Sequence, residues 1–152
     1  MKGVFGLNNQ NDLYSKLEWE FKNLSSEPQN GYHAYNFFVT AWHLLEWKYP
    51  NDKKTCKEIR DSMPLLQICE HLAVGAKHFA PTNPNLESVI ESKKSSVWGL
   101  AWAKGTWKEG SWDSWLVINL DGDARAEFGQ IVKAHEFANL VMNYWRKEIE
   151  HN

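Results

Sequence analysis

The first part of the chain shows the spacing of apolar residues that is typical of amphipathic helices. Four apolar side chains recur at intervals of four, four and three residues and predict one buried helical stripe: Leu13, Leu17, Phe21 and Leu24. Asn11 is the predicted N-cap, because its side chain can accept a hydrogen bond from an unpaired N–H of the first turn. Residues 25–30 contain a proline and are expected to end this helix.

Residues 31–49 are apolar almost all round, which predicts a central helix that ends before Pro50. The polar residues of this helix recur at intervals of three, four and three and so share one stripe: His33, Asn36, Thr40 and His43. A short charged helix is predicted for residues 52–61, and Pro64 suits the first turn of a further helix over residues 64–79. Apolar residues in that last helix predict a buried seam: Leu65, Cys69, Leu72, Ala76 and Phe79.

After residue 95 the apolar period changes to two, as expected for strands that are half buried in a sheet. Three large residues alternate with smaller ones in the first predicted strand: Trp98, Leu100 and Trp102. A turn at residues 104–110 leads to a second strand over residues 112–120, which has one face made of Leu116, Ile118 and Leu120. Asp121-Gly122 is typical of a tight turn and would lead into a short third strand at about residues 124–128.

The C-terminal residues predict one more amphipathic helix, at about residues 130–150. Its apolar stripe recurs at intervals of three and four: Ile131, Ala134, Ala138, Val141 and Trp145. If the third strand does not form, Asp123 is expected to cap this helix instead. Together these elements predict a single α+β domain over residues 1–152. It is mainly a bundle of four or five helices, most of them within residues 11–80. A two- or three-stranded antiparallel β-meander, at about residues 95–128, is inserted before the C-terminal helix.

Length and charge exclude several classes of protein. The 152 residues are enough for one domain, and 17 basic against 19 acidic residues give a net charge of −2, which argues against a nucleic-acid partner. The two cysteines, Cys56 and Cys69, form no CxxC pair and are expected to be free thiols. No signal peptide or membrane span is predicted, so we expect a soluble protein in the cytoplasm that does not bind membranes.

The histidines suggest a polar groove between two helices. If the helices at residues 31–49 and 64–79 pack antiparallel, His43 is level with His71 and His33 with His78. The candidate groove then contains His33, Asn36, Thr40, His43, His71, Lys77 and His78. Neutral imidazole is a common metal ligand and acid–base group, so His43 and His71 are candidate ligands of a divalent metal. The alternative is a hydrogen-bonded layer that sets the register of the helices, and we predict no cofactor.

Tryptophan is the unusual feature of the composition. Nine tryptophans are present, and five of them fall within eighteen residues: Trp98, Trp102, Trp107, Trp112 and Trp115. Such rings form a candidate binding surface, because aromatic faces stack on flat ligands and are enriched at protein interfaces. The alternative is that they form the core between the meander and the helices. Trp107, in the predicted turn, is expected to be the most exposed.

Residues 36–47, NFFVTAWHLLEW, resemble a segment found in a group of uncharacterised bacterial proteins. Those proteins carry a second segment similar to residues 72–79, LAVGAKHF, and a terminal helix with an aromatic pair like Tyr144-Trp145. The resemblance implies an intracellular bacterial protein and brings no activity with it. The helical part is also comparable with HEPN-type nucleases, although their signature, an Arg followed a few residues later by a His, is absent.

From these patterns we expect a binding or interaction protein. The candidate mode of action is self-association, with a homodimer as one form, or binding of a partner through the Trp-rich meander. The alternative is a metal-dependent or HEPN-like enzyme that uses histidines between two helices.

Overall fold

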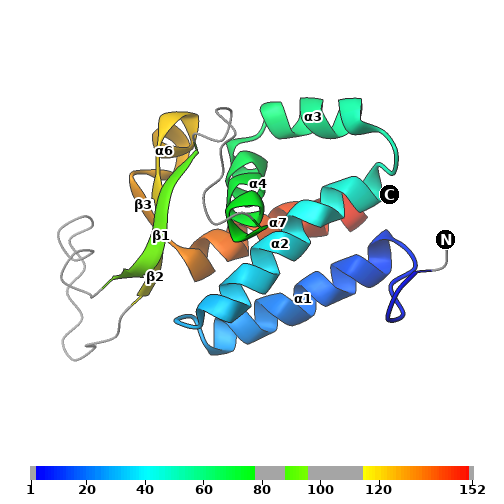
Figure 1. Ribbon diagram of the computed structural model, residues 1–152, viewed down its shortest axis with the longest axis horizontal. Helices are drawn as coiled ribbons and strands as arrows, with labels where there is room; N and C mark the ends of the chain where they lie inside the picture. The colour runs from blue at the N-terminus through cyan, green and yellow to red at the C-terminus, as the bar shows by residue number, and fades with distance from the viewer. Residues whose placement is uncertain (1–2, 78–87, 96–114, 151–152) are drawn as a thin grey trace.

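The computed structural model has a layer of helices with a small antiparallel sheet at one end (Figure 1). It describes residues 3–77, 88–95 and 115–150. The helices in this part are α1 (Gln10–Ser26), α2 (Gly31–Lys48), α3 (Lys53–Asp61), α4 (Pro64–Lys77), α6 (Gly122–Phe128) and α7 (Ala134–Glu150). The strands are β1 (Val89–Ser95), β2 (Trp115–Leu120) and β3 (Ile131–Lys133). The α+β prediction, with the sheet before the C-terminal helix, is confirmed.

Short polar side chains cap the first three helices. Asn9, rather than Asn11, is the N-cap of α1, and its Oδ1 accepts hydrogen bonds from the backbone N–H groups of Asn11 and Asp12. Asn30 caps α2 and Asp52 caps α3 in the same way. Each cap satisfies an N–H that has no partner within its helix, which is why these helices begin where they do.

The main core lies between α1, α2, α4 and α7. Its fully buried side chains include Leu17 of α1, Leu44 of α2 and Trp145 of α7. The seam predicted for α4 is wrong in detail: Leu65 and Leu72 are only half buried, and the buried residues are Leu66, Ile68, Cys69 and Ala73. Helix α4 contacts α2, α3, α6 and β1, so its buried positions do not follow a single stripe.

The sheet has the order β1-β2-β3, and both pairs are antiparallel. Strand β1, residues 89–95, is mostly polar and was not predicted from the sequence. The predicted first strand at residues 98–102 and the turn at residues 104–110 lie outside the described residues. A bulge lies between Val89 and Glu91. As predicted, Leu116, Ile118 and Leu120 share one face, which packs against the helical core and is called the inner face below.

The third strand is not where the sequence predicted it. Residues 124–128 belong to helix α6, and the third strand is residues 131–133. The reason is that Asp121 does not form a hairpin turn but acts as an N-cap, with an extended backbone and a side chain that accepts from the N–H of Gly122. Gly129, with a positive φ of 90°, ends this helix and allows the chain to turn back as β3.

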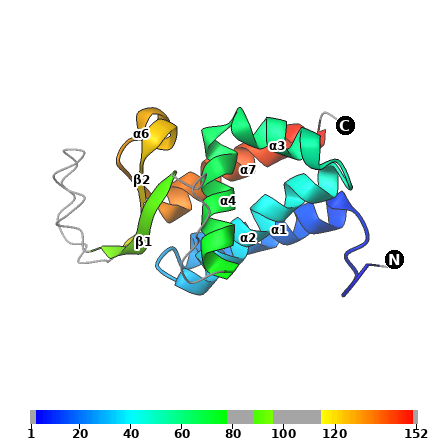
Figure 2. The same ribbon diagram turned by 45° about the horizontal axis from the view of Figure 1, so that its top comes forward.

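Two views show how the helices are arranged relative to the sheet. Helix α4 crosses α2 at a steep angle and does not lie alongside it (Figure 2). The turn before α1 and the end of α7 lie at the end of the molecule away from the sheet (Figure 1). Within the described residues, no helix has the length and apolar character needed to cross a lipid bilayer. Both cysteines are free, as predicted, and Cys69 is fully buried.

Candidate functional site

A groove of about 470 Å³ lies between the inner face of the sheet and helices α2 and α4. This volume is within the range of small-molecule sites. Much of its wall is apolar and comes from three separate parts of the chain: Ala34 and Phe38 of α2, Leu72 of α4, and Leu116 and Ile118 of β2. Tyr35 and Ile90 also line the groove, although roughly half or more of each side chain is exposed, at 49% and 65%.

Among the described residues, His71 is the histidine that lines this groove. Its Nδ1 accepts a hydrogen bond from the backbone N–H of Val89, at 3.1 Å. Because an N–H can only donate, Nδ1 carries no proton, and the neutral ring must therefore carry its proton on Nε2. Burial lowers the pKa of His71, which favours this neutral form. His71 thus offers one N–H donor, at Nε2, in a groove whose other described polar lining residues are Tyr35, Glu91 and Ser92.

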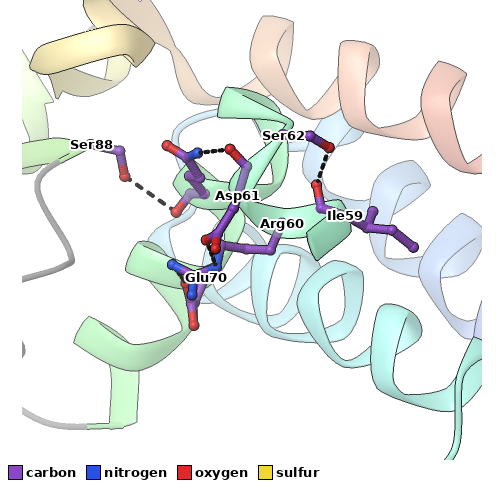
Figure 3. Close-up of polar contacts among 7 residues, drawn as sticks. Ile59, Arg60, Asp61, Ser62, Glu70 and Ser88 are labelled. Carbon is purple, nitrogen blue, oxygen red and sulfur yellow. Dashed lines mark hydrogen bonds and ion pairs between the residues drawn. The ribbon is translucent and has the colours of Figure 1, made fainter. Parts of the chain in front are cut away.

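A network of polar contacts fixes the start of β1 on α4. The hydroxyl of Ser88 donates to the carbonyl oxygen of Gln67, at 3.2 Å, and the amide of Gln67 donates to the carbonyl of Asp61. Ser88 is also 3.4 Å from Nδ1 of His71. This network connects the α3–α4 corner to the strand that holds the His71 ring (Figure 3).

An ion-pair cluster holds the α3–α4 corner itself (Figure 3). Nη1 of Arg60 is 3.3 Å from the carboxylate of Glu70, and Nε is 3.0 Å from that of Asp61. The pKa of Glu70 is raised by burial, and Arg60 partly opposes this effect. The hydroxyl of Ser62 donates to the carbonyl of Ile59 and closes the end of α3. We interpret this cluster as structural, because it joins α3 to α4 and does not line the groove.

Two glycines leave open space at the groove wall. Apart from the adjoining residues and the backbone of the same helix, no described atom lies within 4 Å of the position that a Cβ would occupy at Gly31 or at Gly75. Gly75 does not have a positive φ, so the helical backbone does not require glycine there. Glycine in a helix is about 1 kcal/mol less favourable than alanine. Neither packing nor backbone conformation in the described part explains Gly75, whereas an occupant of the groove would.

The structure separates the histidines that the sequence grouped. His33 lies 3.5 Å from Glu27, in the loop after α1, and His43 is exposed. The level-by-level pairing of His43 with His71 requires antiparallel helices, and the steep crossing of α2 and α4 does not provide them (Figure 2). His78 lies outside the described residues, as does the side chain of Lys77. In residues 3–77, 88–95 and 115–150, no group of three or more His, Cys, Asp or Glu side chains could hold a metal ion.

The other two polar candidates on α2 also have separate environments. Asn36 is exposed. Thr40 is buried, and its hydroxyl is 2.8 Å from Nζ of Lys16, which also pairs with the buried carboxylate of Glu20 at 2.7 Å. Thr40 therefore belongs to a polar contact between α1 and α2, away from the groove.

Of the five clustered tryptophans, the described residues include only Trp115; Trp98, Trp102, Trp107 and Trp112 lie outside them. The indole of Trp115 stacks on His135, with ring centroids 5.1 Å apart, and Nζ of Lys133 lies 4.4 Å from the centroid of the indole. The pKa of His135 is lowered, mainly by burial. Two side chains thus already contact the Trp115 ring.

Sequence reasoning did not find several residues of this region. Ser88 and Val89 lie before the predicted strands, and their polar surroundings gave no periodic signal. Gly75 could have been found from the sequence, because a glycine inside an apolar helical pattern makes the helix less stable than alanine would and so suggests a specific role for that position.

Comparison with known proteins adds no assignment. No protein-family model, curated protein or solved structure matches this chain.

Proposed function

We propose that this protein acts by binding, and that the groove between the inner sheet face and helices α2 and α4 receives an apolar group that carries an oxygen acceptor. The observation that carries this proposal is the position of His71: a neutral ring of fixed tautomer in the wall of a mainly apolar groove. Binding sites of small molecules commonly combine apolar walls with a few fixed polar groups.

The apolar part of the ligand is argued from the walls of the groove. An occupant that covers Phe38, Leu72 and Leu116 removes apolar surface from water, which is favourable by about 25 cal/mol for each Å². Tyr35 and Ile90 at the rim are exposed and can cover the occupant further.

The oxygen acceptor is argued from His71. Its Nε2–H can donate, while its Nδ1 is already bonded to Val89. A carbonyl or carboxylate oxygen matches this donor, and an ammonium group does not. The same bond makes His71 a weaker candidate for the metal-dependent alternative, because a metal-bound histidine ordinarily keeps a proton on its other ring nitrogen, and here that nitrogen, Nδ1, accepts a hydrogen bond. His43 also lies on an exposed position of α2.

Titration of the ¹⁵N-labelled protein with 3-phenylpropionate tests the proposal. We expect the amide signals of Gly31, Gly75 and Val89 to shift, and we expect 3-phenylpropylamine, which has no acceptor, to bind more weakly. Gly75→Leu should fill the groove and weaken binding of 3-phenylpropionate by about tenfold, equivalent to ~1.4 kcal/mol. Ser15→Leu is the matched control, because it adds the same side chain to an exposed position of α1. Equal binding by both variants would contradict the proposal.

A further inference from the structure

The turn before α1 is built in an unusual way. The N–H of Leu7 donates to the carbonyl of Val4, at 3.0 Å, and both central residues have positive φ, 52° at Phe5 and 82° at Gly6. Two consecutive positive φ values are typical of a type I′ turn. Gly3 is required by close approach, since a Cβ there would lie 1.6 Å from the carbonyl oxygen of Leu7.

Phenylalanine at position 5 makes this turn less stable than a residue suited to positive φ would. The first central position of a type I′ turn favours Asn, Asp or Gly, and a bulky residue with positive φ is a conformational outlier. The Phe5 side chain is also completely exposed, at 102%, and its neighbour Val4 is 60% exposed. A side chain that is strained and buries nothing does not stabilise the monomer. Backbone strain of this kind is a reason to look for a function.

We propose that the Val4–Phe5 turn of one copy inserts into the groove of a second copy. This inference rests on the proposed function, because it names the apolar group that the groove receives. The turn lies at the end of the molecule away from the sheet, so Phe5 cannot reach the groove of its own chain (Figure 2). A contact between two different surfaces of the same protein is heterologous and joins copies head to tail.

The chemistry of the two surfaces matches. Val4 and Phe5 supply apolar side chains for the walls at Phe38 and Leu72. The carbonyl oxygens of Val4 and Gly6 already accept from the N–H of Leu7 and the side-chain amide of Asn8, and each keeps a second lone pair that can accept from Nε2–H of His71. The net charge of −2 gives little repulsion between copies. Two side chains bury much less than the roughly 1,200 Å² of a stable interface, so we expect weak association that increases with concentration.

Sedimentation equilibrium of the full chain tests this inference. The wild type should increase in average mass with concentration without reaching a plateau at the dimer. Phe5→Asn keeps a residue that tolerates positive φ, so it should fold normally and associate at least about tenfold more weakly. Trp19→Asn is the matched control, because Trp19 is exposed on α1 and lies outside the turn, and it should associate like the wild type.

Mixing two variants shows whether the turn meets the groove. The Phe5→Asn variant has an intact groove but lacks the apolar turn, and the Gly75→Leu variant has an intact turn but a filled groove. Each variant alone should therefore be monomeric. A mixture of the two should form a one-to-one complex, in which the turn of one variant enters the groove of the other. If the wild type stays monomeric while 3-phenylpropionate still binds, this inference is wrong and the proposed function stands. If Gly75→Leu associates like the wild type, the turn docks elsewhere and the inference is also wrong. If the Gly75→Leu variant also binds 3-phenylpropionate as tightly as the wild type does, the proposed function fails as well.

Discussion

A single backbone hydrogen bond determines which proton His71 carries. The N–H of Val89 occupies Nδ1, and burial disfavours the charged ring. Protonation would place a hydrogen on Nδ1, directly opposite the N–H of Val89, and would break this bond. The same interaction therefore sets the tautomer of His71 and holds the first residue of β1.

The pKa of His71 predicts how stability depends on pH. Its folded-state pKa lies below the ordinary value of 6.5, so the unfolded chain binds the proton more readily. The contribution of His71 is thus complete above about pH 6.5 and is lost as the pH falls from 6.5 towards the folded-state pKa. We expect thermal unfolding between pH 7.5 and 5.5 to show a fall in Tm.

His71→Asn is the variant that isolates this effect. The Asn Oδ1 can take the place of Nδ1 and does not titrate, so the fall in Tm should be smaller than in the wild type. Part of the fall should remain, because burial also lowers the pKa of His135. An identical pH dependence in the two proteins would show that His71 does not contribute.

Gly75 gives a second prediction at this scale. Gly75→Ala should raise the free energy of unfolding by about 0.5–1 kcal/mol, because alanine favours the helix and the Cβ meets open space. Gly129→Ala is the control. A Cβ at Gly129 would also meet open space, but the φ of 90° is unfavourable for any residue with a side chain, so the free energy of unfolding should fall. Chemical denaturation measures both, and a destabilised Gly75→Ala would mean that an atom fills the space.

At the scale of elements, α1 and α2 are joined by a polar contact as well as by apolar packing. Nζ of Lys16 contacts both Glu20 and Thr40, and Glu20 is 3% exposed. Phe21 of the predicted α1 stripe is half buried and packs against the core, whereas the burial of Glu20 was not predicted. The spacing of apolar residues shows which face of a helix is buried on average. It does not show that one carboxylate on that face, Glu20, has a cation as its partner, so the burial of Glu20 could not be predicted.

A double-mutant cycle measures this contact. Lys16→Met leaves the Glu20 carboxylate buried without its cation, and we expect a loss of about 1–2 kcal/mol, reduced from the value for a fully buried pair because Lys16 is 37% exposed. Lys16→Met combined with Glu20→Leu should recover part of that loss. Additive effects in the cycle would contradict a direct interaction.

The Asp121-Gly122 pair at the start of α6 is compatible with two local structures. Asp-Gly after a strand predicts a hairpin turn, and Asp is also a good N-cap. The residues that follow decide between them, since the sequence GDARAEF contains good helix formers and no β-branched residue. Asp121→Ala should therefore destabilise the protein by about 1 kcal/mol in chemical denaturation. Asp123→Ala, which removes a first-turn acid that is not the cap, should have a smaller effect.

At the scale of the whole molecule, the groove exists because distant segments meet. Residues 31–38, 71–75, 89–92 and 116–118 approach one another only through the crossing of α2 and α4 and the pairing of β1 with β2. The sequence predicted most of the helices and the class of the fold, because these depend on local periodicity. His71 was among its candidate groove residues, and a functional role for this residue stays a prediction. The sequence could not predict the crossing angle, which depends on packing between elements, and so it placed His71 opposite the wrong residues.

The most direct test of the groove as a binding site is an isotope-filtered NOE experiment on the labelled protein in the presence of unlabelled 3-phenylpropionate. Contacts are expected from the phenyl ring to the side chains of Leu72, which lines the groove from α4, and of Leu116 and Ile118, which line it from β2. Contacts confined to other surfaces, such as the neighbourhood of Trp19 on α1, would show that the groove is not the binding site and would contradict the central claim.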